Sequence, residues 1–198
     1  MRDPENTRKT ILLESANLFN TQGYKATSIS DITKATGFTK GAIYRHFESK
    51  ADLEKHALQR LSSMMFEHLG VSIKAAPDFE QKFEAIFSFF EQYMESPFYE
   101  GGCPLMNAAV EVDDGLPELR AQAQTILNKL KNSVRTLVVN GIENGQVGAD
   151  IDTEAFVHIV IASLEGGIMM SKLEGKRYPI QLVIEHLRTV VSAQIKSE

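Results

Sequence analysis

The stretch TSISDITKATGFTKGAIYRHFESK, residues 27–50, constrains the fold more than any other part of the chain. Two short segments with the apolar spacing of helices lie on either side of Gly37, where a left-handed backbone is easiest for glycine. Ser28 and Asp31 have the spacing of a capping box at the start of the first segment, and Thr39 can cap the second. Two short helices joined by a tight turn and packed on a preceding helix predict a helix-turn-helix.

The rest of the chain also has the periodicity of helices, with no convincing strand, internal repeat or low-complexity segment. A helix precedes the stretch and ends near Gly23. Helix starts follow at Ser49, Asp78, Pro104, Leu116, Asp152 and Pro179. We therefore expect an all-α protein of about nine helices. We place a boundary near residue 50, with a three-helix helix-turn-helix domain over 1–50 and a larger helical domain over 51–198.

The charge of the chain is unevenly distributed. The net charge is −5, yet residues 1–50 carry eight lysines and arginines against five acids. The remaining residues carry 13 basic and 21 acidic side chains. A basic N-terminal part on an acidic body indicates that only the N-terminal part meets a polyanion.

The second short helix of the stretch has an exposed face of small and basic residues suited to the major groove of DNA. Thr39 and Lys40 can hydrogen-bond to base edges, Ala42 offers a methyl group to thymine, and Gly41 lets the backbone approach. Arg45 adds a positive charge to this face. The donors that surround the face are suited to phosphates: Thr27, Ser28, Tyr44, His46 and Lys50.

These residues, together with the preceding pattern R-x-x-I-L-x-x-A-x-x-L-F-x-x-x-G over 8–23, resemble the DNA-binding domain of TetR/AcrR-family transcriptional regulators. The chain length and the loop G-x-x-x-G-x-V-x-A-D-I-D over 141–152 are similar to that family as well. The N-terminal match is specific and covers about a quarter of the chain, whereas the C-terminal part matches in its helical layout. The resemblance implies a repressor that binds a palindromic double-stranded DNA operator as a homodimer and is released by a small apolar or electrophilic molecule.

The resemblance also implies a ligand cavity among the C-terminal helices. Aromatic, methionine and other apolar side chains concentrate in two segments, FEAIFSFFEQYM and SPFYEGGCPLMNAAVE, and suit an apolar ligand. An aromatic stripe on a helix also suits ordinary core. The candidate ligand-binding residues are Phe83, Phe87, Phe90, Met94, Phe98, Cys103, Met106, Asn107 and Met170.

Cys103 is the only cysteine, which excludes an intramolecular disulfide. It precedes the helix expected at Pro104, whose dipole can lower the pKa of the thiol. The segment GGCPLMN resembles one that some family members use to sense oxidants or electrophiles. The alternatives are a thiol sensor and an inert buried side chain.

The resemblance places a dimer interface on the last two helices, as a four-helix bundle. Small side chains there allow helices to approach closely. The residues expected in the interface are His158, Ile159, Ala162, Gly166, Ile184, Leu187 and Val191.

An enzyme or carrier that uses the apolar cavity is the competing hypothesis. The histidines outside the stretch have no metal-ligand spacing, and no nucleophile motif or glycine-rich phosphate loop occurs. We therefore expect no catalytic residue, metal or cofactor. The N-terminus lacks the apolar region of a secretory signal, and no apolar run is long enough for a membrane span. These features indicate a cytoplasmic protein.

Overall fold

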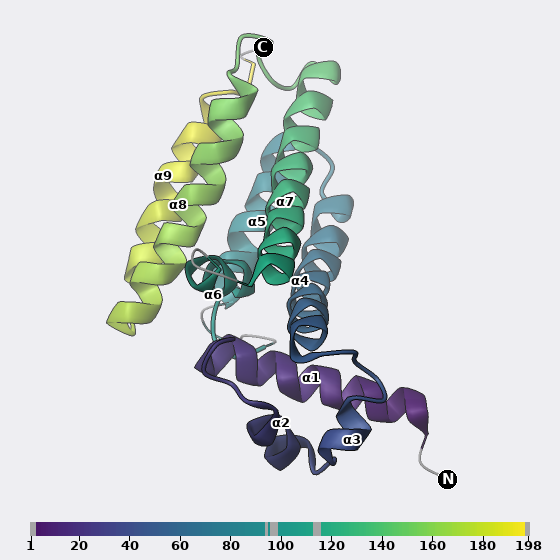
Figure 1. Ribbon diagram of the computed structural model, residues 1–198. Coiled ribbons are helices and arrows are strands. Elements are labelled where there is room, and N and C mark those ends of the chain that lie inside the picture. The colour runs from purple at the N-terminus through teal and green to yellow at the C-terminus, as the bar shows by residue number, and fades with distance from the viewer. Residues whose placement is uncertain (1–2, 94, 96–98, 113–115, 197–198) are drawn as a thin grey trace. The chain divides into compact units, whose positions relative to one another are not determined.

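The computed structural model describes residues 3–93, 95, 99–112 and 116–196. Nine helices lie in this part of the chain, as expected from the sequence, and two compact units can be distinguished (Figure 1). Unit 1 comprises residues 1–65 and 99–127, and unit 2 comprises residues 66–98 and 128–198. The chain passes from one unit to the other within two long helices, α4 (Lys50–Ala75) and α7 (Pro117–Glu143).

Unit 1 contains α1 (Pro4–Gln22), α2 (Ile29–Thr36), α3 (Lys40–Ile43), α6 (Pro104–Glu111) and the first parts of α4 and α7. Its core is a cluster of fully buried apolar side chains from α1 to α4. They are Ile11, Phe19, Tyr24, Ile32, Ile43, Phe47, Leu53 and Leu58. Phe19 and Tyr24 stack with ring centroids 5.2 Å apart, which joins the end of α1 to the turn before α2.

Unit 2 contains α5 (Phe79–Tyr93), α8 (Thr153–Glu174), α9 (Tyr178–Ser192) and the second parts of α4 and α7. Helices α8 and α9 lie side by side (Figure 1). A Cβ at Gly167 would lie 2.7 Å from Ile180 Cδ1, so glycine permits this close approach. Arg188 on α9 donates to both carboxylate oxygens of Glu84 on α5, at 2.9 and 2.7 Å. Asp152 caps α8 by accepting from the Ala155 amide at 3.0 Å, as expected.

In contrast to the expectation from the sequence, helix α8 is long and apolar enough, by length and composition alone, to cross a membrane. In the fold it packs along α9 and buries one side of its surface. The buried residues on α8 are Phe156, Val157, Val160, Leu164, Gly167, Ile168 and Ser171. This one-sided burial is the pattern of a core helix in a globular protein.

The division into units differs from the sequence boundary near residue 50. Helix α4 begins at this boundary, and its first part, up to residue 65, belongs to the same unit as the helix-turn-helix. Helix α6 lies between α5 and α7 in the sequence but belongs to unit 1. The Asn107 side chain, in the middle of α6, bonds to α1, and the Glu111 side chain, at its end, bonds to the turn between α1 and α2.

Candidate nucleic-acid interface

The start of α2 is fixed by the capping box that the sequence predicts. The Ser28 hydroxyl accepts from the Asp31 amide at 3.2 Å, and the Ser28 amide donates to Asp31 Oδ2 at 3.0 Å. Hydrogen bonds from the hydroxyl and amide of Ser28 hold the pKa of the Asp31 carboxyl below its ordinary value. Ser28, the N-cap residue of α2, is exposed at the surface.

The turn and the start of α3 also have the predicted local structure. Gly37 has φ 69° and ψ 8°, the left-handed conformation that ends α2. Thr39 Oγ1 accepts from the Ala42 amide at 3.2 Å and caps α3. Ile43 and Phe47 are buried and hold α3 against the core. The helix ends at Ile43, and residues 44–46 continue as a turn.

Four of the residues predicted to read DNA are exposed together on α3 and the turn after it: Lys40, Gly41, Tyr44 and Arg45. Lys40 Nζ lies 5.8 Å from the centroid of the Tyr44 ring, a distance at which the cation and ring attract. Nothing lies within 4 Å of the position that a Cβ on Gly41 would take, so this part of α3 is open to a close approach. Thr39 is exposed and His46 is half-buried.

Two residues predicted to contact DNA are buried instead. Thr27 is fully buried, and its hydroxyl donates to the Gly23 carbonyl oxygen at 2.7 Å, so it closes the turn before α2. Ala42 is only 9% exposed because it lies on the side of α3 that faces the core. These findings correct the expected phosphate contact of the Thr27 side chain and the expected thymine contact of the Ala42 methyl group.

Lys50, predicted to hold a phosphate, is already engaged within unit 1. Its ammonium group donates to the Tyr24 carbonyl oxygen at 2.6 Å and lies 3.0 Å from Glu54 Oε1. The Glu54 side chain is 2% exposed. Burial raises the pKa of the Glu54 carboxyl, and the Lys50 ammonium offsets part of this rise. Lys50 therefore neutralises a buried carboxylate. The i,i+4 spacing of this pair is visible in the sequence, but the burial of Glu54 is not.

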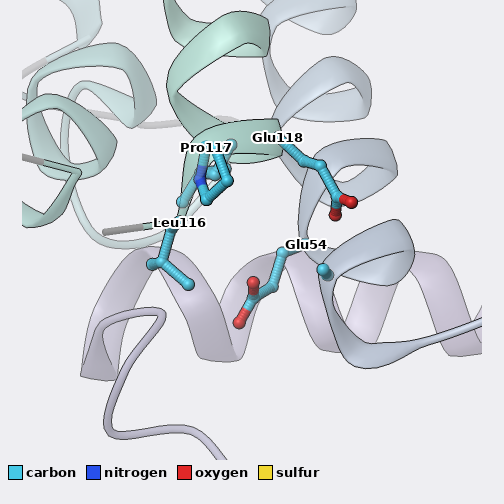
Figure 2. A pocket seen from close by; sticks show the side chains of 6 residues that line it. Glu54, Leu116, Pro117 and Glu118 are labelled. Carbon is cyan, nitrogen blue, oxygen red and sulfur yellow. The ribbon is translucent and has the colours of Figure 1, made fainter.

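A cleft of about 280 Å³ lies beside this ion pair, between the starts of α4 and α7 in unit 1 (Figure 2). Its walls are formed by Ala51, Glu54, Leu116, Pro117, Glu118 and Leu119. Figure 2 shows Glu54 projecting from α4 and Glu118 from the start of α7. Leu116 has φ 55°, a left-handed conformation uncommon for leucine, immediately before α7 begins. No sequence pattern indicates this cleft, since its residues come from two distant segments.

The residues expected to bind a ligand are divided between the two units. On α5, Phe83 and Phe87 are buried in unit 2, and Phe83 packs against Phe156 with ring centroids 5.5 Å apart. Phe90 is half-buried, and Met170 is exposed on α8. The contacts of Phe83 are those of a core side chain. Met94 and Phe98 lie outside the described residues.

The other three candidates belong to unit 1. Cys103 is 6% exposed and is the N-cap residue of α6, while Met106 is half-buried. Asn107 Nδ2 donates to the Asn20 carbonyl oxygen at 3.1 Å and to Asn20 Oδ1 at 3.0 Å. The Asn107 amide thus serves a contact between α6 and α1, and its role in binding a ligand stays a prediction. The burial of Cys103 restricts access of an electrophile to the thiol.

The residues expected at the dimer interface fall into two groups. His158, Ile159 and Ala162 are exposed on α8, and Gly166 beside them has open space at its Cβ position. A second group, on α9, is buried inside unit 2: Ile184, Leu187 and Val191. The pairing of α8 with α9 and the packing of α9 on α5 bury these three side chains. Their assignment to a dimer interface is therefore corrected to the core of the single chain.

Among the described residues, no group of three or more histidine, cysteine, aspartate or glutamate side chains is placed to hold a metal ion. Among the carboxyl groups with resolved pKa shifts, Asp31 belongs to a helix cap, Glu54 is buried, and Glu84 and Glu154 are in ion pairs. The candidate site with the most complete geometry is accordingly the exposed face around α3.

Comparisons with known proteins agree with this geometry. Residues 11–57 match the family described as bacterial regulatory proteins, tetR family. Residues 80–187 match the tetracyclin repressor-like C-terminal domain, which extends over more than half of the chain. The first match contains α2 and α3 with their cap residues, and the second contains α6, α7 and α8 and all but the first residue of α5.

The HTH-type transcriptional repressor DhaR of Mycobacterium sp. (strain GP1) is 25% identical over 174 residues, covering 87% of this chain and 86% of DhaR. A TetR transcriptional regulator from Chloroflexus aurantiacus has a crystal structure that is 34% identical, with a TM-score of 0.93 over 100% of both chains. CifR, solved as a cysteine mutant with 26-bp operator DNA, has a TM-score of 0.81 at 20% identity over 91% of this chain and 94% of that chain. The CifR likeness concerns the fold alone. The chain belongs to the TetR family of bacterial transcriptional regulators.

Proposed function

We propose that this protein is a transcriptional repressor that binds a palindromic DNA operator as a homodimer and is released by a small molecule. The observation that carries the DNA-binding part is the exposed group of Lys40, Gly41, Tyr44 and Arg45 on a capped α3. Small side chains and cations at the start of a recognition helix suit base edges and phosphates. Repression is proposed because the related DhaR is a repressor.

The homodimer is supported by an apolar face on α8 and α9 that unit 2 leaves uncovered. We call it the α8–α9 face, and its exposed apolar residues are Ile159, Met169, Met170, Leu173, Tyr178 and Leu182. Those on α8 recur at helical spacing on one side, beside His158, Ala162 and Gly166. Single-chain proteins rarely expose so much apolar surface in one place, so a second copy is the proposed occupant.

A small, apolar effector is proposed from the aromatic content of α5. Phe90 is half-buried beside Phe89, with ring centroids 5.2 Å apart, while Phe83 and Phe87 form the adjoining core. Aromatic walls with few polar groups suit apolar ligands. The relatives found are transcriptional regulators and none belongs to an enzyme family, so regulation of transcription is preferred over catalysis. We expect such a protein to work in the cytoplasm, where it meets chromosomal DNA.

The DNA-binding proposal is tested by incubating the purified protein with fragments of the genome of its source and sequencing those that it retains. We expect a small set of retained fragments with a shared inverted repeat, held less tightly as salt rises. Lys40→Ala should alter the preferred sequence, whereas Arg45→Ala should weaken binding to all fragments and lower the salt dependence. Retention of fragments without any shared sequence would contradict the proposal.

A further inference from the structure

Helix α6 and the segment before it are hydrogen-bonded to α1 and to the turn between α1 and α2. It lies 60 residues or more beyond α3 in the sequence, yet it packs on α1 within unit 1. At its start is the segment Gly101–Gly102, in which both glycines have φ 96°. At its end is Glu111, the last residue of the helix.

The first anchor is formed by two asparagines. Asn107 Nδ2 donates to Asn20 Oδ1 at 3.0 Å and to the Gly101 carbonyl oxygen at 2.9 Å. Asn20 Nδ2 donates in return to the carbonyl oxygens of Glu100 and Gly102, the latter at 3.0 Å. Asn20 is only 4% exposed, so this network is buried at the end of α1. Buried amides bonded on several sides fix the relative position of the segments that carry them.

The second anchor is the Glu111 carboxylate. Its Oε1 accepts from the Tyr24 amide and its Oε2 accepts from the Lys25 amide, both at 2.9 Å. These amides belong to the turn between α1 and α2, and the carboxylate satisfies both of them. Hydrogen bonds to an ionised acceptor are stronger than those between neutral groups. Glu111 thus holds two consecutive residues of the turn in one orientation.

The turn held by Glu111 leads directly to the start of α2. Thr27, two residues after Lys25, closes on the Gly23 carbonyl oxygen, and Ser28 caps α2. The direction in which α2 leaves the turn decides where α3 lies relative to α1. From this geometry we infer that Glu111 is a positioning residue for DNA reading, which acts through the turn and touches no DNA itself. The inference rests on the proposed DNA-binding function.

Because Glu111 is negatively charged, the inference predicts the direction in which its removal changes the affinity for DNA. A carboxylate in the DNA-binding unit repels phosphates, so its removal should by charge alone tighten binding to any DNA. If Glu111 positions the turn, the same removal should weaken specific binding. The two effects change operator affinity in opposite directions. A measured loss of operator affinity therefore indicates positioning, and a measured gain indicates the effect of charge alone.

The test compares Glu111→Ala and Glu111→Gln with wild type, and Glu143→Gln serves as the control. Glu143 is exposed at the end of α7, and its substitution changes the net charge equally. We expect Glu111→Ala to weaken binding to the selected operator by about tenfold or more, with binding to unrelated DNA unchanged or tighter. Glu111→Gln, which keeps the size and one acceptor oxygen, should fall between Glu111→Ala and wild type. Operator affinity in both Glu111 variants equal to or tighter than that of the Glu143 control would overturn the inference.

Amide hydrogen exchange gives a second readout that needs no DNA. Exchange at Tyr24 and Lys25 should accelerate in the Glu111 variants, while exchange in the core of α1 and the free energy of unfolding of Glu111→Gln stay close to wild type. If Glu111→Ala does not fold, Glu111→Gln alone decides both measurements. Unchanged exchange at both amides would contradict the anchor. Absence of specific DNA binding by the wild type would instead reject the proposed function and leave the exchange result as the test of the anchor.

Discussion

Lys50 Nζ lies 3.0 Å from Glu54 Oε1 and donates to the Tyr24 carbonyl oxygen at 2.6 Å. The lysine closes the sequence motif of the helix-turn-helix, and the glutamate lies one turn later on α4. The pair connects the start of α4 to the turn before α2. Tyr24 itself is fully buried, and burial raises the pKa of its hydroxyl above the ordinary range. Through its contacts with Glu54 and the Tyr24 carbonyl oxygen, Lys50 stabilises the fold of unit 1.

Replacement of Lys50 by methionine should lower the free energy of unfolding by about 1–3 kcal/mol, because it leaves a buried carboxylate and a carbonyl oxygen without their cation. Chemical denaturation measures this loss. Lys55→Met is the matched control, since Lys55 is exposed on the same helix. The double variant Lys50→Met/Glu54→Gln should recover part of the stability. Equal stability of Lys50→Met and Lys55→Met would contradict a structural role for Lys50.

The raised pKa of Glu54 predicts a specific pH dependence. Burial disfavours the charged carboxylate, so the folded protein binds a proton at Glu54 at a higher pH than the unfolded chain does. Glu54 therefore contributes to stability below the pKa of its carboxyl in the unfolded chain, about 4.3. This contribution is lost as pH rises through the pKa of the same carboxyl in the folded protein. Glu54→Gln should be more stable than wild type near neutral pH, and this difference should shrink on acidification. Denaturation of both proteins between about pH 4 and pH 7 checks the sign. A difference that grows toward low pH would show that the carboxylate is stabilised by the fold.

Gly101→Ala should disrupt the hydrogen bonds between Asn20 on α1 and the segment before α6. A Cβ at this position would lie 2.3 Å from the Asn20 carbonyl oxygen, and the φ of 96° disfavours alanine independently. We expect a loss of about 2–4 kcal/mol in the free energy of unfolding. Gly145→Ala separates the two causes, because Gly145 has φ 73° with nothing within 4 Å of its Cβ position. That control should lose only about 1 kcal/mol, so equal losses in the two variants would exclude the steric clash with Asn20.

Leu173→Glu should dissociate the proposed homodimer. Leu173 is 84% exposed in the single chain and lies on the α8–α9 face, where a charge would be buried between two copies. We expect the dissociation constant of the dimer to rise at least about tenfold in sedimentation equilibrium. Val71→Glu introduces the same charge at a residue that is 73% exposed on α4, outside this face. An equal effect of the two substitutions would argue against the α8–α9 face as the interface.

The sequence was sufficient to predict the local structure of α2 and α3. The cap residues Ser28 and Thr39 and the left-handed Gly37 act within three or four residues of their partners, so their spacing is visible along the chain. The roles of Thr27 and Lys50 could not be predicted in this way. Each looks like a surface donor by residue type, and its burial or pairing depends on how the turn before α2 folds back.

The position of α6 and the core role of Ile184 depend on contacts between distant segments. Glu111 and Tyr24 are separated by 87 residues, and no sequence pattern predicts which residue a glutamate at a helix end will bond to. Ile184 has the apolar spacing of an interface residue as much as that of a core residue. Only the pairing of α8 with α9 and the packing of α9 on α5 decide between these two roles.

Hydroxyl-radical footprinting on a selected operator tests the central claim most directly, namely that a dimer reads DNA through α3. We predict two symmetry-related protected patches whose centres are about one helical turn, roughly 10 base pairs, or a whole multiple of that apart. Lys40→Ala should lose the protection while the protein remains folded and dimeric. A single protected patch, or a footprint that persists unchanged in Lys40→Ala, would contradict the claim.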